Sequence, residues 1–110
     1  MKLWIDDVRP TPEGYIGFNT VNDTLRYIRL NRDFIYEINL DHDAGDCKAE
    51  GGDYIAILNE IEQLSHRPTS EGVEWNEWVC KQVVFHIHSM NPVGVENMRR
   101  IIQRNGWKEV

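Results

Sequence analysis

The sequence lacks any apolar run close to the roughly 20 residues that a membrane-spanning helix requires. It also lacks the apolar core of a signal peptide, because Met1 and Lys2 run directly into a strand-like segment. We therefore expect a cytoplasmic protein that does not interact with membranes.

Positive charge is scarce as well. Eighteen acidic residues against twelve basic ones give a formal net charge of −6. A chain with this balance does not hold nucleic acid by general attraction to phosphate, so we expect no general DNA binding. A local site for a small anion or for one strand end remains compatible with this charge.

Cysteine is rare. Cys47 and Cys80 are the two cysteines, and neither has a neighbour at the spacing of a zinc motif. Two reduced thiols are the expected state in the cytosol, although a disulfide is possible.

The length of 110 residues fits one domain, residues 1–110. Segments 2–5, 15–19, 36–40 and 82–88 have the residue types of strands, and 106–110 is a weaker fifth candidate. Thr20 with Asp23 resembles a capping box, and Asn91 with Pro92 is a good helix start. Strands alternating with helices predict an α/β fold, with a mostly parallel sheet of four to five strands and helices on both faces.

Two segments complicate this prediction. Residues 8–14, VRPTPEG, contain two prolines and favour turns over a helix, so the second strand pairs with the first either parallel or antiparallel. Residues 65–80 do not indicate one structure: Pro68 and Gly72 favour a loop, and EWNEWV allows a short helical turn. The spacing of Trp75 and Trp78 is more typical of packing than of base stacking.

Polar side chains follow three of the strand segments. The carboxyl ends of parallel strands meet at one edge of a sheet, where α/β proteins place their sites. The residues concerned are Asp6, Asp7 and Arg9 after the first segment and Asp41, His42 and Asp43 after the third. His88 ends the fourth segment, and Ser89 and Asn91 follow it.

Three motifs carry a resemblance to a known family. DD at 6–7, LDHDAGD at 40–46 and HSMNPVG at 88–94 together resemble the cyclic-phosphate-processing receiver family, which is related to response-regulator receivers. The resemblance implies a flavodoxin-like, receiver-like sheet without its first helix, in agreement with the proline-rich segment 8–14. It also implies action on cyclic phosphate ends of RNA or nucleotides.

The resemblance assigns several positions. Asp6 and Asp7 resemble the acidic pair of a receiver, Asp41 stands at the phosphate-accepting position, and Ser89 resembles the hydroxyl residue after the fourth strand. A receiver also has a lysine at the end of its fifth strand, whereas this chain has only Lys108 in its terminal segment. His42 and His88 are additions that a phosphorelay receiver does not need.

Carboxylates clustered at one edge of the sheet repel one another, by about 1 kcal/mol per pair at 4 Å in water and about 4 kcal/mol at an effective dielectric of 20. Some other group must offset this repulsion. A divalent cation held by Asp6, Asp7 and Asp41, with Asp43 as a further ligand, is the simplest offset. Oxygen ligands favour Mg²⁺. Pairing with Arg9, or a raised pKa on one aspartate, are the alternatives.

The histidines indicate proton transfer. Opening a cyclic phosphodiester requires a base for the attacking water and an acid for the departing oxygen, and histidine serves both roles near neutral pH. We therefore predict a phosphodiesterase in which His42 and His88 are acid and base, with Asp41 assisting them. Arg9, Ser89 and Asn91 would contact phosphate. The alternatives are a non-enzymatic phosphoacceptor or ligand-binding module, with Asp41 as acceptor, and an interaction domain with a degenerate pocket.

Overall fold

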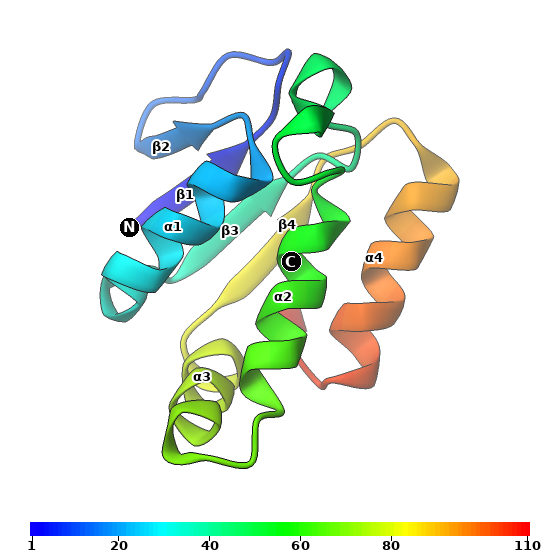
Figure 1. The fold of residues 1–110 in the computed structure, drawn as a ribbon. Helices are drawn as coiled ribbons and strands as arrows, with labels where there is room; N and C mark the ends of the chain where they lie inside the picture. The colour runs from blue at the N-terminus through cyan, green and yellow to red at the C-terminus, as the bar shows by residue number, and fades with distance from the viewer.

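The computed structural model describes residues 1–110 as one five-stranded, fully parallel sheet with four α-helices (Figure 1). The strand order is β2-β1-β3-β4-β5. The strands are β1 (Lys2–Ile5), β2 (Tyr15–Phe18), β3 (Glu37–Leu40), β4 (Val84–Ile87) and β5 (Lys108–Glu109). Lys2 is in register with Tyr15 in a parallel pair, so the antiparallel alternative for the second strand is wrong.

Two of the four helices, α1 (Val21–Asn31) and α4 (Pro92–Arg104), begin where the sequence places their caps. The others are α2 (Ile55–Ser65) and α3 (Ser70–Lys81), and short 3₁₀ turns lie at Arg32–Phe34 and Gly45–Ala49. The Thr20 hydroxyl accepts a hydrogen bond from the Asp23 amide at 3.1 Å, and the Asn91 side chain accepts one from the Gly94 amide at 3.0 Å. These bonds satisfy amides that have no partner within the helix.

The segment that the sequence left undecided contains α3. Thr69 caps this helix by accepting a hydrogen bond from the Gly72 amide at 3.4 Å. Trp75 and Trp78 are buried in the core, with their rings edge to face at 5.5 Å. The packing interpretation of the two tryptophans is therefore confirmed.

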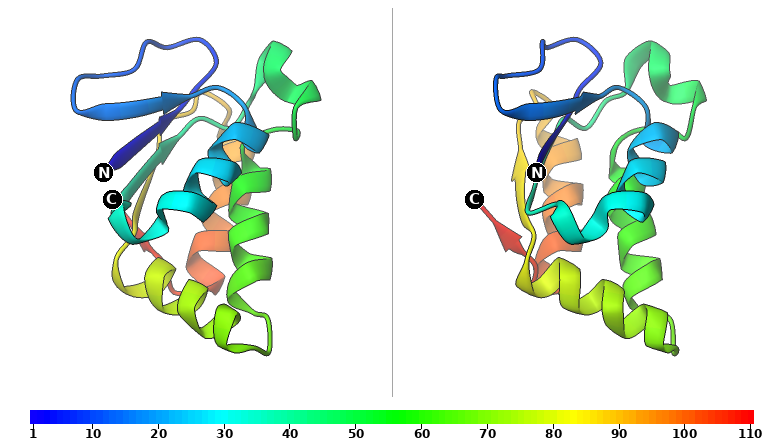
Figure 2. Two further views of the ribbon diagram at one scale, coloured as in Figure 1. Left: turned by 60° about the vertical axis from the view of Figure 1, so that its left-hand side comes forward. Right: turned by 90° about the vertical axis from the view of Figure 1, so that its left-hand side faces the viewer.

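The helices leave one face of the sheet uncovered, so the prediction of helices on both faces is wrong (Figure 2). The connections from β2 to β3, from β3 to β4 and from β4 to β5 cross the sheet in one direction. Right-handed crossovers therefore place all of them on the same side. Only the connection from β1 to β2 runs the other way, and its residues 6–14 form a loop without a helix, as predicted.

Side chains alternate between the two faces of the sheet. Leu3, Ile38 and Phe85 are fully buried beneath the helices, within a single core of 22 apolar residues. The uncovered face carries Trp4 and Asn39 instead, in register with each other. None of the four α-helices has the length and apolar composition that a membrane span requires.

Candidate functional site

The polar strand ends meet at the carboxyl edge of the sheet, as the parallel arrangement predicts. They surround a cavity of 270 Å³. The lining residues are Asp6, Val8, Arg9, Asp41, Asp43, Ser89, Met90 and Asn91. All of these except Val8 and Met90 are residues that the sequence singles out, so remote segments do form one cleft.

The loop after β1 is held in place by Asp6. Its Oδ1 accepts hydrogen bonds from the amides of Val8 at 2.8 Å and Arg9 at 3.0 Å. The Arg9 guanidinium in turn donates to the carbonyl oxygen of His88 at 2.5 Å. This bond ties the loops after β1 and β4 together across the end of β3, and it leaves other N–H groups of Arg9 without a protein partner.

His88 is fixed on three sides. Its Nε2 lies 2.9 Å from Asp6 Oδ2, and its Nδ1 lies 2.5 Å from Asn39 Oδ1. The ring stacks on Trp4, with ring centroids 3.9 Å apart and planes inclined by 6°. The Asp6 side chain is fully buried and that of His88 is 10% exposed, so water has little access to the pair.

Burial and hydrogen bonding act against each other in this pair. Burial would raise the pKa of Asp6, but the amides of Val8 and Arg9 and the ring of His88 outweigh it, and the pKa lies below its ordinary value. Burial lowers the pKa of His88 despite the attraction of Asp6. The ring is therefore neutral at neutral pH. In the neutral ring, Nε2 carries the proton and donates to Asp6. Nδ1 then accepts a hydrogen bond from the Asn39 side chain when its amide is turned so that the NH₂ group faces the ring.

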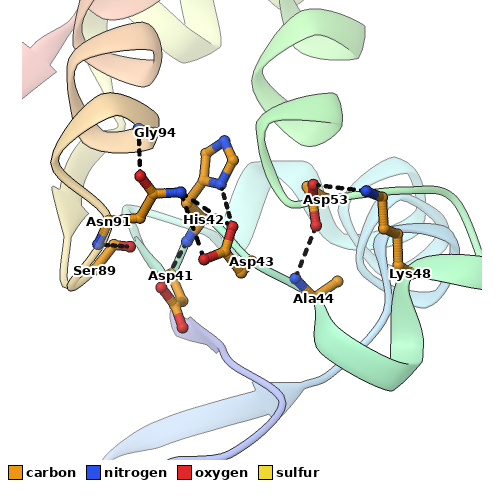
Figure 3. A network of polar contacts seen from close by, with 9 residues as sticks. All are labelled: Asp41, His42, Asp43, Ala44, Lys48, Asp53, Ser89, Asn91 and Gly94. Atoms are coloured by element: carbon orange, nitrogen blue, oxygen red, sulfur yellow. Dashed lines mark hydrogen bonds and ion pairs between the residues drawn. The ribbon is translucent and has the colours of Figure 1, made fainter.

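His42 lies on the helical side of the cleft. Its Nδ1 is 2.7 Å from Asp43 Oδ1, and its ring packs so closely on α4 that a Cβ at Gly94 would lie 2.5 Å from His42 Cγ (Figure 3). Nε2 has no protein partner. The bond with His42, together with a 3.3 Å contact from Asn91, holds the pKa of Asp43 below its usual value.

The two histidines thus occupy different sides of the site. His42 contacts α4, whereas His88 contacts β1 and the uncovered face, and no hydrogen bond joins them. Each one is instead bonded to a carboxylate that lines the cleft, His42 to Asp43 and His88 to Asp6. In Figure 3 the Asp41 carboxylate lies on the side opposite to the His42 ring, and one of its oxygens accepts the hydrogen bond from the His42 amide.

Three carboxylates gather beside the cleft. Oxygen atoms of Asp6, Asp7 and Asp41 lie within 4.8 Å of one another. Burial raises the pKa of Asp7, and the nearby charges of Asp6, Asp41 and Asp46 raise it further. This all-oxygen donor set fits a hard cation such as Mg²⁺.

Asp43, which the sequence analysis names as a further metal ligand, lies outside this group. It lies with His42 and Asp53, whose ligand atoms are within 4.8 Å of one another. Asp53 Oδ1 accepts a hydrogen bond from the Ala44 amide at 3.1 Å, and its Oδ2 lies 3.4 Å from the Lys48 ammonium. Asp43 therefore stands between the cleft and a second polar group.

Sequence reasoning did not single out Trp4, Asn39 or Asp53 as parts of the site. Asn39 carried a signal, since it is a polar residue within a strand that is otherwise apolar at Ile38 and Leu40. Trp4 gave none, because an aromatic residue in a strand is ordinary.

The parallel sheet, the acidic residues after β1 and β3 and the hydroxyl after β4 define a receiver-like α/β domain. The chain belongs to the family of the cyclic-phosphate processing receiver domain, whose family model matches residues 1–104. No curated protein and no solved structure matches the chain.

The receiver lysine has no equivalent in the cleft. Lys108 is in register with Val84 at the start of β4, far from the carboxyl edge, and its ammonium contacts the Lys81 carbonyl at 3.5 Å. No lysine lines the cleft.

Proposed function

We propose that this domain hydrolyses a cyclic phosphodiester, carried by an RNA end or a nucleotide, in the cleft at the carboxyl edge of the sheet. One observation carries the proposal. Arg9, Ser89 and Asn91, which suit phosphate, line the same cavity as Asp6 and Asp43, the two carboxylates bonded to histidines.

The phosphate would be held at the side of the cleft formed by the loop after β4. Arg9 offers guanidinium N–H groups and Ser89 offers a hydroxyl. The first amides of α4, a helix of 13 residues capped by Asn91, point the positive end of the helix dipole at this position. These donors would balance the negative charge that the neighbouring aspartates place near a bound anion.

His42 is the better candidate for the base. When Nδ1 donates to Asp43, the lone pair of Nε2 remains free to accept a proton. The water oxygen would then bond to phosphorus while one ester P–O bond of the ring breaks. Asp41 would hold the backbone of His42 in place, since its Oδ1 accepts the His42 amide at 2.7 Å.

His88 is the better candidate for the acid. A phosphate anion in the cleft adds negative charge beside Asp6 and favours the protonated imidazole, raising the pKa of His88 from its lowered value. The protonated ring would donate from Nε2 to the departing oxygen as its contact with Asp6 opens. The product is a phosphomonoester, and proton exchange with water restores both rings.

Asp6, Asp7 and Asp41 would hold a divalent cation, for which Mg²⁺ is the first choice. Such a cation supplies charge that offsets the repulsion among the three carboxylates and polarises a phosphate oxygen.

The test is hydrolysis of a short RNA with a 2′,3′-cyclic phosphate end, in magnesium and in chelator, followed by mass spectrometry of the product. We expect ring opening by the natural sequence and a loss of at least about a hundredfold in His42→Gln and His88→Gln. Arg9→Gln should raise KM more than it lowers kcat. His66→Gln is the matched control, since His66 contacts Asn105 away from the cleft. Absence of ring opening under both conditions would reject the proposal.

The position of Asp41 also favours a second candidate, a phosphoacceptor domain. Asp41 lines the cleft with Ser89, as the acceptor and hydroxyl residues of a receiver would. Treatment with a small phosphodonor and magnesium should then add the mass of one phosphoryl group, and Asp41→Asn should abolish the addition. Unchanged mass of the natural sequence would exclude this role.

A further inference from the structure

Two exposed apolar side chains stand among the polar residues of the cleft. Val8 is 81% exposed and Met90 is 86% exposed, and both line the cavity. Neither side chain packs on the apolar core. The cleft therefore has an apolar rim that folding does not require.

Hydrogen bonds to residues of the site fix the backbone of the two loops that carry Val8 and Met90. The Val8 amide donates to Asp6, and the loop around Met90 is closed by a 3.2 Å hydrogen bond from the Asn91 amide to the Ser89 hydroxyl. The contact of Arg9 with the His88 carbonyl joins these two loops. Val8 and Met90 thus occupy fixed loops above the carboxyl ends of β1 and β4.

Both residues are next to the proposed phosphate contacts in the chain. Val8 precedes Arg9, and Met90 lies between Ser89 and Asn91. A group bound against the rim would therefore be a near neighbour of a phosphate held by these side chains. In a nucleoside cyclic phosphate, the base is a flat and largely apolar ring only one sugar away from the phosphorus.

We propose that Val8 and Met90 form a binding site for the nucleobase of the substrate, an inference that rests on the proposed function. Contact with the two side chains removes apolar surface of the base and of the protein from water. Neither side chain of the rim can form a hydrogen bond with the edge of a base. The rim therefore binds a base through apolar contact and does not read its hydrogen-bonding groups. The substrate class is then a nucleoside cyclic phosphate or an RNA end, and not a cyclic phosphate on a base-free sugar or glycerol.

The experiment compares three ligands: adenosine and uridine 2′,3′-cyclic phosphates and the base-free methyl riboside 2′,3′-cyclic phosphate. KM should be lowest for the adenosine compound, because a purine covers more apolar surface, and highest for the riboside. Val8→Ser and Met90→Ser should each raise KM about fivefold for the nucleotides and leave it unchanged for the riboside. Leu30→Ser is the control, since Leu30 is 77% exposed and does not line the cleft.

Hydrolysis of all three compounds with equal KM would overturn the base site and leave the proposed hydrolase intact. If no compound is hydrolysed, Kd values measured by calorimetry for the same ligands test the base site separately from the hydrolase proposal. Tighter binding of the nucleotides, lost in Met90→Ser, supports the base site although the hydrolase proposal fails. Equal Kd values for all three ligands, the result expected if the rim contacts a protein instead, would overturn the inference.

Discussion

The carboxylate of Asp6 and the imidazole of His88 are 2.9 Å apart although 82 positions separate them in the chain. Asp6 follows β1 and His88 follows β4, and β3 lies between these strands. The contact therefore spans the full width of the candidate site. It joins two side chains to which water has little access.

Asp6→Ala should destabilise the fold. The substitution removes the acceptor for the amides of Val8 and Arg9 and for His88, and each buried donor left without a partner costs about 1–3 kcal/mol. We expect the free energy of unfolding, measured by urea denaturation at pH 7, to fall by about 3 kcal/mol. Asp6→Asn keeps an acceptor for the two amides and should lose less. Equal losses in the two variants would contradict this account.

The pH dependence of stability should follow the same pair. The pKa of His88 lies below 6.5 in the folded protein, so its contribution to stability is present above pH 6.5 and is lost as the pH falls through the folded pKa. The pKa of Asp6 lies below 3.8, so its contribution is lost only at still lower pH. We expect NMR titration of the His88 ring to give a pKa below 6.5, and a lower one in Asp6→Asn, where the attracting charge is gone. A higher pKa in that variant would refute the role of the Asp6 charge.

Asp7→Asn should stabilise the protein. The pKa of Asp7 is raised by burial and by Asp6, Asp41 and Asp46, so its negative charge opposes folding above that pKa. Solvent screening limits the gain to about 1 kcal/mol at pH 7 and low salt. The gain should vanish below pH 3.8, where the carboxyl is protonated in both states. Urea denaturation at the two pH values measures this difference, and destabilisation at pH 7 would contradict it.

Added Mg²⁺ should raise the thermal midpoint of the natural sequence if the three carboxylates bind a cation, because a ligand that binds only the folded state stabilises it. Asp41→Asn should reduce the rise, since Asp41 supplies one of the clustered oxygens. Asp33→Asn is the control, since Asp33 is exposed beside Arg32 and lines neither cavity to which Asp6 contributes. The same rise in all three proteins would show that the cation acts elsewhere.

Gly94→Ala should displace the ring of His42. The added Cβ would lie 2.5 Å from His42 Cγ, closer than two unbonded carbons approach. We expect shifted ring resonances of His42 in NMR spectra and reduced ring opening if His42 is the base. Val93→Ala is the neighbouring control, because Val93 is 69% exposed. Unchanged His42 resonances in Gly94→Ala would mean that the added Cβ does not displace the ring.

Local features of the sequence predicted most of the fold. Alternating apolar residues located four strands, and the caps at Thr20 and Asn91 located the starts of α1 and α4. Residues 65–80 were not predictable, because their helix depends on burying Trp75 and Trp78 against distant elements. The absence of helices from one face follows from strand order, which no local pattern encodes.

Residue types and their order along the chain are enough to bring these side chains to the carboxyl edge, because parallel strands that end in polar residues must place those ends together. How the side chains pair there depends on the packed fold. It set His88 against Asp6, Asn39 and Trp4, placed His42 with Asp43 beneath α4, and separated Asp43 from the other aspartates. Those pairings depend on the face of the sheet to which each residue points and on the order of the strands, and both are properties of the packed chain.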